Sequence, residues 1–253
     1  MKKLFTFFML FLVFMLKSNI IYSLLSPTSE INIKGKDESI NYADKIRLEK
    51  EIDSKLEIFF NAIRGHRNKY VKSHLKTEEN LKSRENFIKE NTKSGIYGPG
   101  SDYTLFPMGD TTLIDVNTRD RYGYTPIIVA IESKNDEILE ILIKNGVNIR
   151  EKHPVFGKLT LHTASYFQNE NAVEMLLKLD PTLANSQSGT DGWTPLQDAT
   201  LKSNSKIVKL LLDYGADPLI KDYKGGTAMD MATEFGKGEI VKLLRDKIKS
   251  NRR

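Results

Sequence analysis

One short motif returns four times in the second half of the chain, and its spacing limits the possible folds more than any other feature. Each copy opens on a turn glycine and reaches a small alanine seven residues later. The glycines step by 34, 35 and 33 residues along Gly123, Gly157, Gly192 and Gly225. A repeat of this length predicts one supersecondary unit per copy, which buries its apolar face only by stacking on its neighbours.

The residues around these landmarks predict two helices per unit. Thr125 and Thr194 are expected to cap the first helix by accepting a backbone N–H, and the proline after each suits the first helical position. A leucine stands twelve residues after each repeat alanine, on the apolar face of the second helix. Gly146 and Gly215 suit a left-handed residue at its end, and Asp-to-Gly segments such as 120–123 predict the turns between units.

At these residues the sequence resembles the ankyrin repeat, with its Gly-x-Thr-Pro-Leu-His-x-Ala opening and its Leu-Leu-x-x-Gly-Ala-Asp close. Leu159, Thr160, Ala228 and Asp180 depart from that pattern. The resemblance covers about residues 113–249 and implies an all-α solenoid whose helix pairs are joined by hairpin-like turns. The expected units are 116–149, 150–184, 185–218 and 219–249.

The two ends of such a stack must be polar or covered. In the last copy Arg245 replaces an apolar residue, and a basic tail follows at 250–253. At the front, apolar residues at helical spacing predict a charged helical region over 40–93, with a first helix ending near Gly65 and a second reaching about Thr92. We expect this region to fold over the first repeat. A Gly- and Pro-rich loop at 94–112 separates the two parts.

The N-terminus carries the features of an export signal. Two lysines precede an apolar run at 4–16, which is too short for a comfortable membrane span of about 20 residues. We expect a signal peptide at 1–23 and a polar linker at 24–39. The alternative is an uncleaved signal anchor in the inner membrane. The lysine-rich composition is typical of an AT-rich bacterial genome. A bacterial protein with an export signal is expected to be periplasmic or secreted.

The resemblance also implies where a partner protein would bind: on the hairpin tips and on the concave face formed by the first helices. Eight of the nine aromatic residues after position 113 fall at those positions, and binding surfaces are enriched in aromatic residues. Tyr122, Phe156, Tyr166 and Tyr223 are the strongest individual candidates. The full predicted set is Arg121, Tyr122, Tyr124, Val155, Phe156, Lys158, Tyr166, Phe167, Trp193, Leu201, Lys202, Tyr223, Lys224 and Phe235, with Glu132, Ser133, Thr190, Asp191 and Glu234 beside them.

The sequence offers few groups for catalysis. It has no cysteine, which excludes disulfides, thiolate nucleophiles and Cys-ligated metals. We predict no catalytic, cofactor or metal site and no small-molecule substrate. His162 occupies the family's structural histidine position, where the ring is expected to serve backbone hydrogen bonds. A basic run at 64–76 is interpreted as the solvated face of a helix, and a patch for nucleic acid or anionic lipid is the alternative.

Three functional hypotheses remain open. The first is a non-enzymatic, exported protein that binds a partner protein of the bacterial envelope or of a host. The second is a membrane-anchored tethering protein with the basic run on anionic lipid. The third is an effector with an activity in 40–112.

Overall fold

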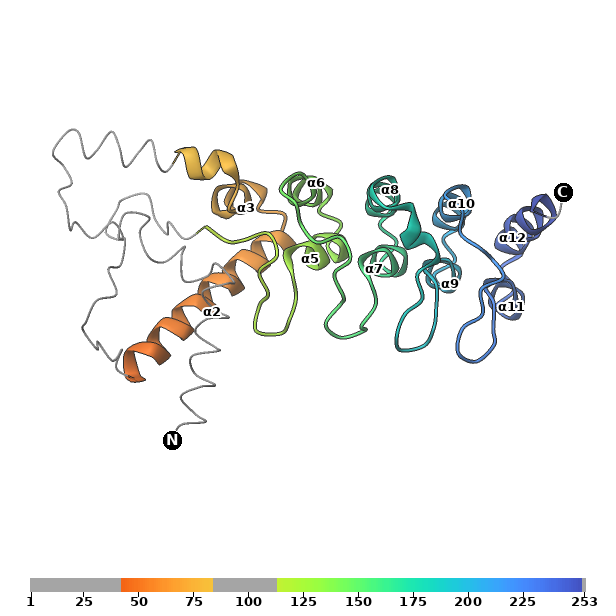
Figure 1. Cartoon of the computed structure of the whole chain (residues 1–253), viewed down its shortest axis with the longest axis horizontal. Coiled ribbons are helices and arrows are strands. Elements are labelled where there is room, and N and C mark those ends of the chain that lie inside the picture. The colour runs from red at the N-terminus through yellow and green to blue at the C-terminus, as the bar shows by residue number, and fades with distance from the viewer. Residues whose placement is uncertain (1–41, 84–112, 252–253) are drawn as a thin grey trace.

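The computed structural model describes residues 42–83 and 113–251, which form one elongated stack of helices (Figure 1). The side chains are described from residue 49 onward. The expected signal peptide, the linker and the Gly/Pro loop lie outside these residues.

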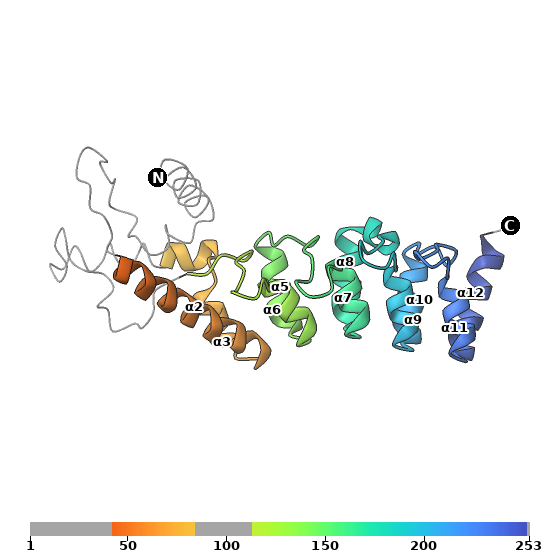
Figure 2. The ribbon, with the colours of Figure 1, turned by 90° about the horizontal axis from the view of Figure 1, so that it is seen from below.

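The four predicted helix pairs are present. The first helices form one row and the second helices a parallel row, while the connections between pairs project to one side (Figures 1 and 2). The described residues contain isolated β-bridges but no strand, which confirms an all-α solenoid. The pairs are α5 (Pro126–Glu132) with α6 (Asp136–Lys144), α7 (Thr160–Tyr166) with α8 (Glu170–Leu179), α9 (Pro195–Leu201) with α10 (Ser205–Asp213), and α11 (Ala228–Glu234) with α12 (Gly238–Ser250).

One continuous core runs through the stack. The repeat alanines are fully buried where the two helices of a unit approach each other, and the leucines at the twelfth position after them are buried as well. Both landmarks of the repeat therefore serve packing. At the C-terminal end, Arg245 is exposed on α12, as expected for a polar cap.

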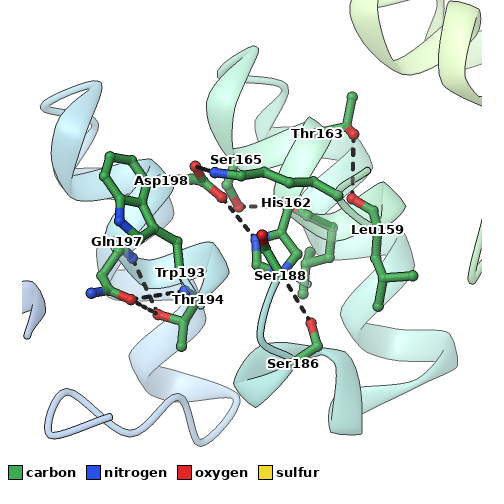
Figure 3. Close-up of polar contacts among 12 residues, drawn as sticks. Leu159, His162, Thr163, Ser165, Ser186, Ser188, Trp193, Thr194, Gln197 and Asp198 are labelled. Carbon is green, nitrogen blue, oxygen red and sulfur yellow. Dashed lines mark hydrogen bonds and ion pairs between the residues drawn. The ribbon is translucent and has the colours of Figure 1, made fainter. Parts of the chain in front are cut away.

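Helix capping agrees with the sequence in one unit and not in another. Thr194 accepts from the amide of Gln197, and the Gln197 side chain accepts in return from the Thr194 amide (Figure 3). Thr125 was predicted to cap α5 in the same way, and this is wrong: its hydroxyl is buried without a hydrogen-bond partner. Position N3 is Ile128 in this unit, so no side chain reaches back to complete a capping box.

The described part of the front region, 42–83, packs against the first repeat as a divergent helix pair of the same kind. Helix α2 spans Tyr42–Arg64 and α3 spans Asn68–His74. His66, between them, has a left-handed φ of 53°, and Lys134 has a φ of 54° at the matching turn of the first repeat. The next amide bonds back to an alanine carbonyl in both cases, Arg67 to Ala62 at 2.9 Å and Asn135 to Ala130 at 2.8 Å.

This front pair belongs to the same core as the repeats. Phe59, Phe60 and Ile63 of α2 are fully buried, and so are Val71 and Leu75. The first repeat has one side that faces away from the other units. Apolar side chains of α2 and α3 cover that side.

The second front helix is shorter than predicted. It ends at His74, and a separate helical segment occupies 78–83; the rest of the predicted range lies outside the described residues. Backbone pairing ends α3, because the Lys76 amide donates to the Ile114 carbonyl at 2.8 Å and the Ile114 amide donates to the His74 carbonyl at 2.7 Å. This pairing places Ile114, just before the first repeat, beside the end of α3.

Candidate functional site

The first hairpin tip is held in shape by an aspartate. Asp120 Oδ1 accepts from the amides of Tyr122 and Tyr124, each at 2.9 Å, and Gly123 adopts the left-handed φ of 84° that closes the turn. This geometry leaves the Tyr122 side chain 64% exposed at the tip. Asp222 organises the fourth tip in the same way, accepting from the amides of Lys224 and Gly226.

A histidine replaces the aspartate at the second tip. His153 Nδ1 accepts from the amides of Val155 at 3.1 Å and Phe156 at 3.2 Å, while its Nε2 lies 2.7 Å from Glu132 Oε1. The two amide donors require an unprotonated Nδ1, so the proton of the neutral ring is on Nε2, facing Glu132. The imidazole is buried, and the tip it shapes presents Val155 and Phe156 to solvent.

Four rings form a continuous line, which we call the aromatic row: Tyr124 of the first tip, His153 and Phe156 of the second tip, and Tyr166 at the end of α7. Their centroids are separated by 5.4 Å, 4.4 Å and 5.9 Å in that order. Phe167 lies beside the last ring, at 5.5 Å from Tyr166. The row crosses from the first unit to the second, and part of each side chain stays accessible except for His153.

A cation lies over the ring at each end of the aromatic row. The Arg64 guanidinium, from α2, is 5.7 Å from the centroid of Tyr124. Lys202 Nζ, from the end of α9, is 3.8 Å from the centroid of Tyr166. Each cation is attracted by the negative face of its ring, so the row joins the front pair to the third unit.

The environment of Tyr124 keeps its hydroxyl neutral at physiological pH. Burial raises its pKa above the ordinary value, and the nearby Glu132 carboxylate raises it further, against a smaller opposing effect of Arg64. The group is therefore a hydrogen-bond donor as well as an apolar surface.

A second cluster links the second and third units through a buried carboxylate. Asp198 has no exposed side-chain surface and receives Lys158 Nζ at 2.8 Å and His162 Nδ1 at 2.8 Å (Figure 3). Lys158 also pairs with Asp191 at 3.2 Å and lies 4.5 Å from the centroid of Trp193. Buried charges need such partners. Lys158, predicted as a binding residue, is therefore largely occupied within the stack.

His162 does not make the backbone hydrogen bonds that were predicted. Its ring lies between Asp198 and the Ser186 hydroxyl, which is 3.4 Å from Nε2. The order Ser–His–Asp resembles a hydrolase relay, but the imidazole is fully buried and the hydroxyl donates to the Leu183 carbonyl at 2.7 Å. The arrangement joins units 2 and 3 and leaves no access for a substrate.

The other predicted binding residues are distributed along the same side of the stack. Arg121 lies over Tyr122 at 4.9 Å and pairs with Glu57 of α2 at 3.5 Å. Tyr223 is 66% exposed, although one face of its ring covers Gly192, where a Cβ atom would lie only 2.5 Å from the ring. The remaining members do not join the aromatic row: Lys224 and Phe235 are exposed, while Leu201 and Trp193 are half-buried.

Two members of the site were not predicted from the sequence. Arg64 was interpreted as part of a solvated basic run, and His153 was given no role. The sequence hides the role of His153, because it stands four residues before its turn glycine while Asp120 and Asp222 stand three before theirs. Arg64 gives no signal either.

The basic run at 64–76 is not simply a solvated face. Lys72 forms an ion pair with Glu137 of α6, and His66 Nε2 lies 2.9 Å from the Ser133 carbonyl. Lys72 draws the pKa of Glu137 below its ordinary value through a hydrogen bond. Part of the run therefore holds α3 against the first repeat. Among residues 42–83 and 113–251, no helix is long and apolar enough to cross a membrane.

Comparison with known proteins agrees with this architecture. The sequence profile described as "Ankyrin repeats (3 copies)" matches residues 105–185 and 161–253. The chain belongs to the ankyrin-repeat family. Its repeats form a module for protein–protein interaction, which is the general role of this family.

Similar proteins share the repeats and differ in the rest of their length. Bovine mitochondrial disaggregase is 32% identical over 136 residues, which are 52% of this chain and 19% of that protein. Human ankyrin repeat and SOCS box protein 11 is 34% identical over 48% of this chain and 36% of that protein. A putative ankyrin repeat protein of fowlpox virus is 30% identical over 52% of this chain and 40% of that protein. The matched part thus spans well under half of each relative.

Proposed function

We propose that the chain binds a protein partner through the aromatic row and the exposed residues of the neighbouring hairpin tips. The observation that supports this most strongly is the clustering of accessible rings: Tyr124, Phe156 and Tyr166 come from three separate segments and meet on one side of the stack. Aromatic anchors of this kind contribute most of the binding energy in protein interfaces.

The hairpin tips extend the same surface. Tyr122, Val155 and Tyr223 are 64%, 68% and 66% exposed, and the aspartate and histidine side chains described above fix the backbone that carries the first, second and fourth tips. A preformed tip loses little conformational entropy when it is bound. The fold supplies rigid positions for side chains that the core does not need.

The test is affinity capture with the unchanged chain and with a variant in which the four strongest candidates are replaced by alanine: Tyr122, Phe156, Tyr166 and Tyr223. A matched control replaces Leu179 and Leu219, which are 51% and 54% exposed but lie outside the predicted surface. We expect a partner that is captured by the unchanged chain and by the control, and lost by the four-residue variant with its thermal unfolding still cooperative. Equal capture by the four-residue variant would show that the surface is wrongly assigned.

We further propose that the protein is exported from a bacterium and acts in the periplasm or in a host. This rests on the lysine pair and apolar run at 1–16. N-terminal sequencing of the chain recovered from the producing cell tests it. A mature chain that begins near Leu24 supports release, whereas retention of residues 4–16 in a membrane fraction would favour the anchored, tethering alternative.

A further inference from the structure

The second hairpin tip is held by a type of side chain that changes charge near neutral pH. His153 Nδ1 accepts from the amides of Val155 at 3.1 Å and Phe156 at 3.2 Å. Histidine titrates between about pH 5 and 8, and its protonated ring donates from both nitrogens. A proton on Nδ1 would point at two N–H groups that are themselves donors, so both bonds require the neutral ring.

The other three tips are held by acceptors of a different kind. The Asp120 and Asp222 carboxylates hold the first and the fourth tip, and carboxylates ordinarily titrate near pH 4, about two units lower than histidine. In the third tip Ser188 stands four residues before its turn glycine, as His153 does in the second. The Ser188 hydroxyl accepts from the amides two and three residues later, at 3.2 Å and 3.4 Å. The second tip therefore has the same bonds as the third, made to a group that can be protonated.

The imidazole has little room to adjust within the closed tip. The His153 side chain is 1% exposed. It meets the Tyr124 ring edge to face at a centroid distance of 5.4 Å and stacks on the Phe156 ring at 4.4 Å. Turning the imidazole over would put carbon atoms where both nitrogens now bond. Protonation of Nδ1 therefore requires the Val155–Phe156 backbone to move away from the ring.

Glu132 acts on the opposite edge of the same ring. Its Oε1 lies 2.7 Å from His153 Nε2, and Nε2 carries a hydrogen in both the neutral and the protonated ring described here. The carboxylate favours the imidazolium, whereas the two amide donors favour the neutral ring. The bond to Glu132 survives protonation and the bonds to the amides do not.

Glu132 is the one ionisable side chain of the described residues that bonds to this imidazole. The Tyr124 hydroxyl, on the adjoining ring, stays neutral as described above. The surrounding tips and helices carry further charged side chains that make no hydrogen bond or ion pair with the imidazole: Arg64, Asp120, Lys152, Lys158, Asp191 and Lys202.

From this arrangement we infer that the second tip is a pH-sensitive element, which is closed while His153 is neutral and opens when Nδ1 takes up a proton. The closed tip binds one proton fewer at this site than the open tip, so a fall in pH favours the open form. Val155 and Phe156 are 68% and 42% exposed on this tip. If they contact a partner, which rests on the proposed function, binding weakens as the tip opens; the opening itself needs no partner.

The opening can be followed by NMR of the ¹⁵N-labelled full chain between about pH 8 and about pH 5, with no partner added. The ring nitrogen shifts of His153, assigned by their loss in His153→Asn, report its protonation. The amide signals and exchange protection of Val155 and Phe156 report the state of the tip. The amides of Tyr122 and Thr190, which bond to Asp120 and Ser188, serve as references in the first and third tips.

We expect the protonation of Nδ1 and the loss of the two amide bonds to share one midpoint, with little change at the reference amides. Below that midpoint the protection of the two amides should fall by up to about tenfold per pH unit, as linkage to one proton requires. His153→Asn, which offers an acceptor that does not titrate, should show no transition. Glu132→Gln keeps an acceptor for Nε2 but removes the charge that favours the imidazolium, so its midpoint should move to lower pH.

Several outcomes would overturn this inference. Protonation of the ring with both amides still protected would mean that the closed tip accommodates the imidazolium. Opening without protonation of the ring, or a transition that persists in His153→Asn, would assign the change to another group. A midpoint that stays in place or rises in Glu132→Gln, or a ring that stays neutral down to about pH 5, would contradict it as well. All of these results are independent of the capture experiment, which alone decides the proposed function.

Discussion

Asn135 donates through its side-chain amide to the backbone carbonyl of Ile63 at 3.0 Å. Asn169 makes the same bond one unit later, to the carbonyl of Ile131 at 3.2 Å. In both cases the asparagine also caps the second helix of its own unit. The shared bond indicates that α2 and α3 stack on the first repeat as a preceding unit would.

The first prediction concerns this bond. Asn135→Ala removes a helix cap and one of the two hydrogen bonds to the Ile63 carbonyl, which keeps the bond from the His66 amide at 3.2 Å. Together these losses should lower the free energy of unfolding by about 2 kcal/mol. Asn204→Ala is the matched control, because Asn204 caps α10 without such an inter-unit bond among the described residues. It should cost only about 1 kcal/mol. Urea unfolding measures both, and equal losses would argue against the inter-unit role.

A second prediction tests whether α2 belongs to the core. Phe60 is fully buried, so Phe60→Ala should lower the free energy of unfolding by about 3–5 kcal/mol. Ile58, two residues earlier, is 45% exposed, and its replacement by alanine should change that free energy by no more than about 0.5 kcal/mol. If both variants unfold like the unchanged chain, the front pair is an appendage and the first repeat is capped in another way.

The buried carboxylate gives a third prediction. Asp198→Ala leaves Lys158 and His162 without their shared partner and should cost about 3–5 kcal/mol of stability. Asp213, which is exposed at the end of α10, provides the control, with an expected change within about 0.5 kcal/mol. Thermal or urea unfolding checks the difference. A small effect at Asp198 would mean that the cluster is less constrained than its geometry indicates.

The third hairpin tip should be sensitive to acid through Asp191. Burial alone would raise the pKa of this carboxyl, but hydrogen bonds from the Ser188 hydroxyl and the Trp193 amide, together with Lys158, hold it below its ordinary value of 3.8. The folded pKa is therefore lower than the unfolded one. The resulting stability is present above the unfolded pKa and is lost as pH falls from about 4 through the folded pKa.

The comparison of the unchanged chain with Asp191→Asn measures this effect. The difference in unfolding free energy between them should be constant from about pH 5 to 7 and should shrink below about pH 4. A difference that does not change across this range would show that Asp191 titrates alike in the folded and unfolded chains.

The repeat was predictable because its landmarks are packing requirements. A small alanine is needed where two helices meet, and a leucine is needed on the buried face of the second helix, so both recur at fixed spacing. The sequence difference between the two caps lies at N3, where Gln197 in the third unit can return a bond to the N-cap amide and Ile128 in the first cannot. The front pair lacks the Gly-x-Thr-Pro landmark altogether. Its one signal was Ala62, which precedes Ala130 by 68 residues, twice the usual step of 34.

The candidate site was predictable only in part. The resemblance to the ankyrin repeat predicted that Tyr124, Phe156 and Tyr166 would lie on the binding side. It did not predict that their rings would form one line of contacts. That contact depends on His153, whose side chain holds the second tip in place of an aspartate. Lys158 was predicted as a contact residue, yet Asp198, a buried acid in the next unit, engages it. A single sequence does not reveal such a pairing.

The most direct test of the binding surface is hydrogen–deuterium exchange of the full chain with and without a captured partner. Binding through the row and tips should slow exchange in 120–126, 153–168 and 188–202, and should leave α6, α8 and α10 unchanged. Protection confined to those second helices would contradict the account, because it would place the partner on the opposite side of the stack.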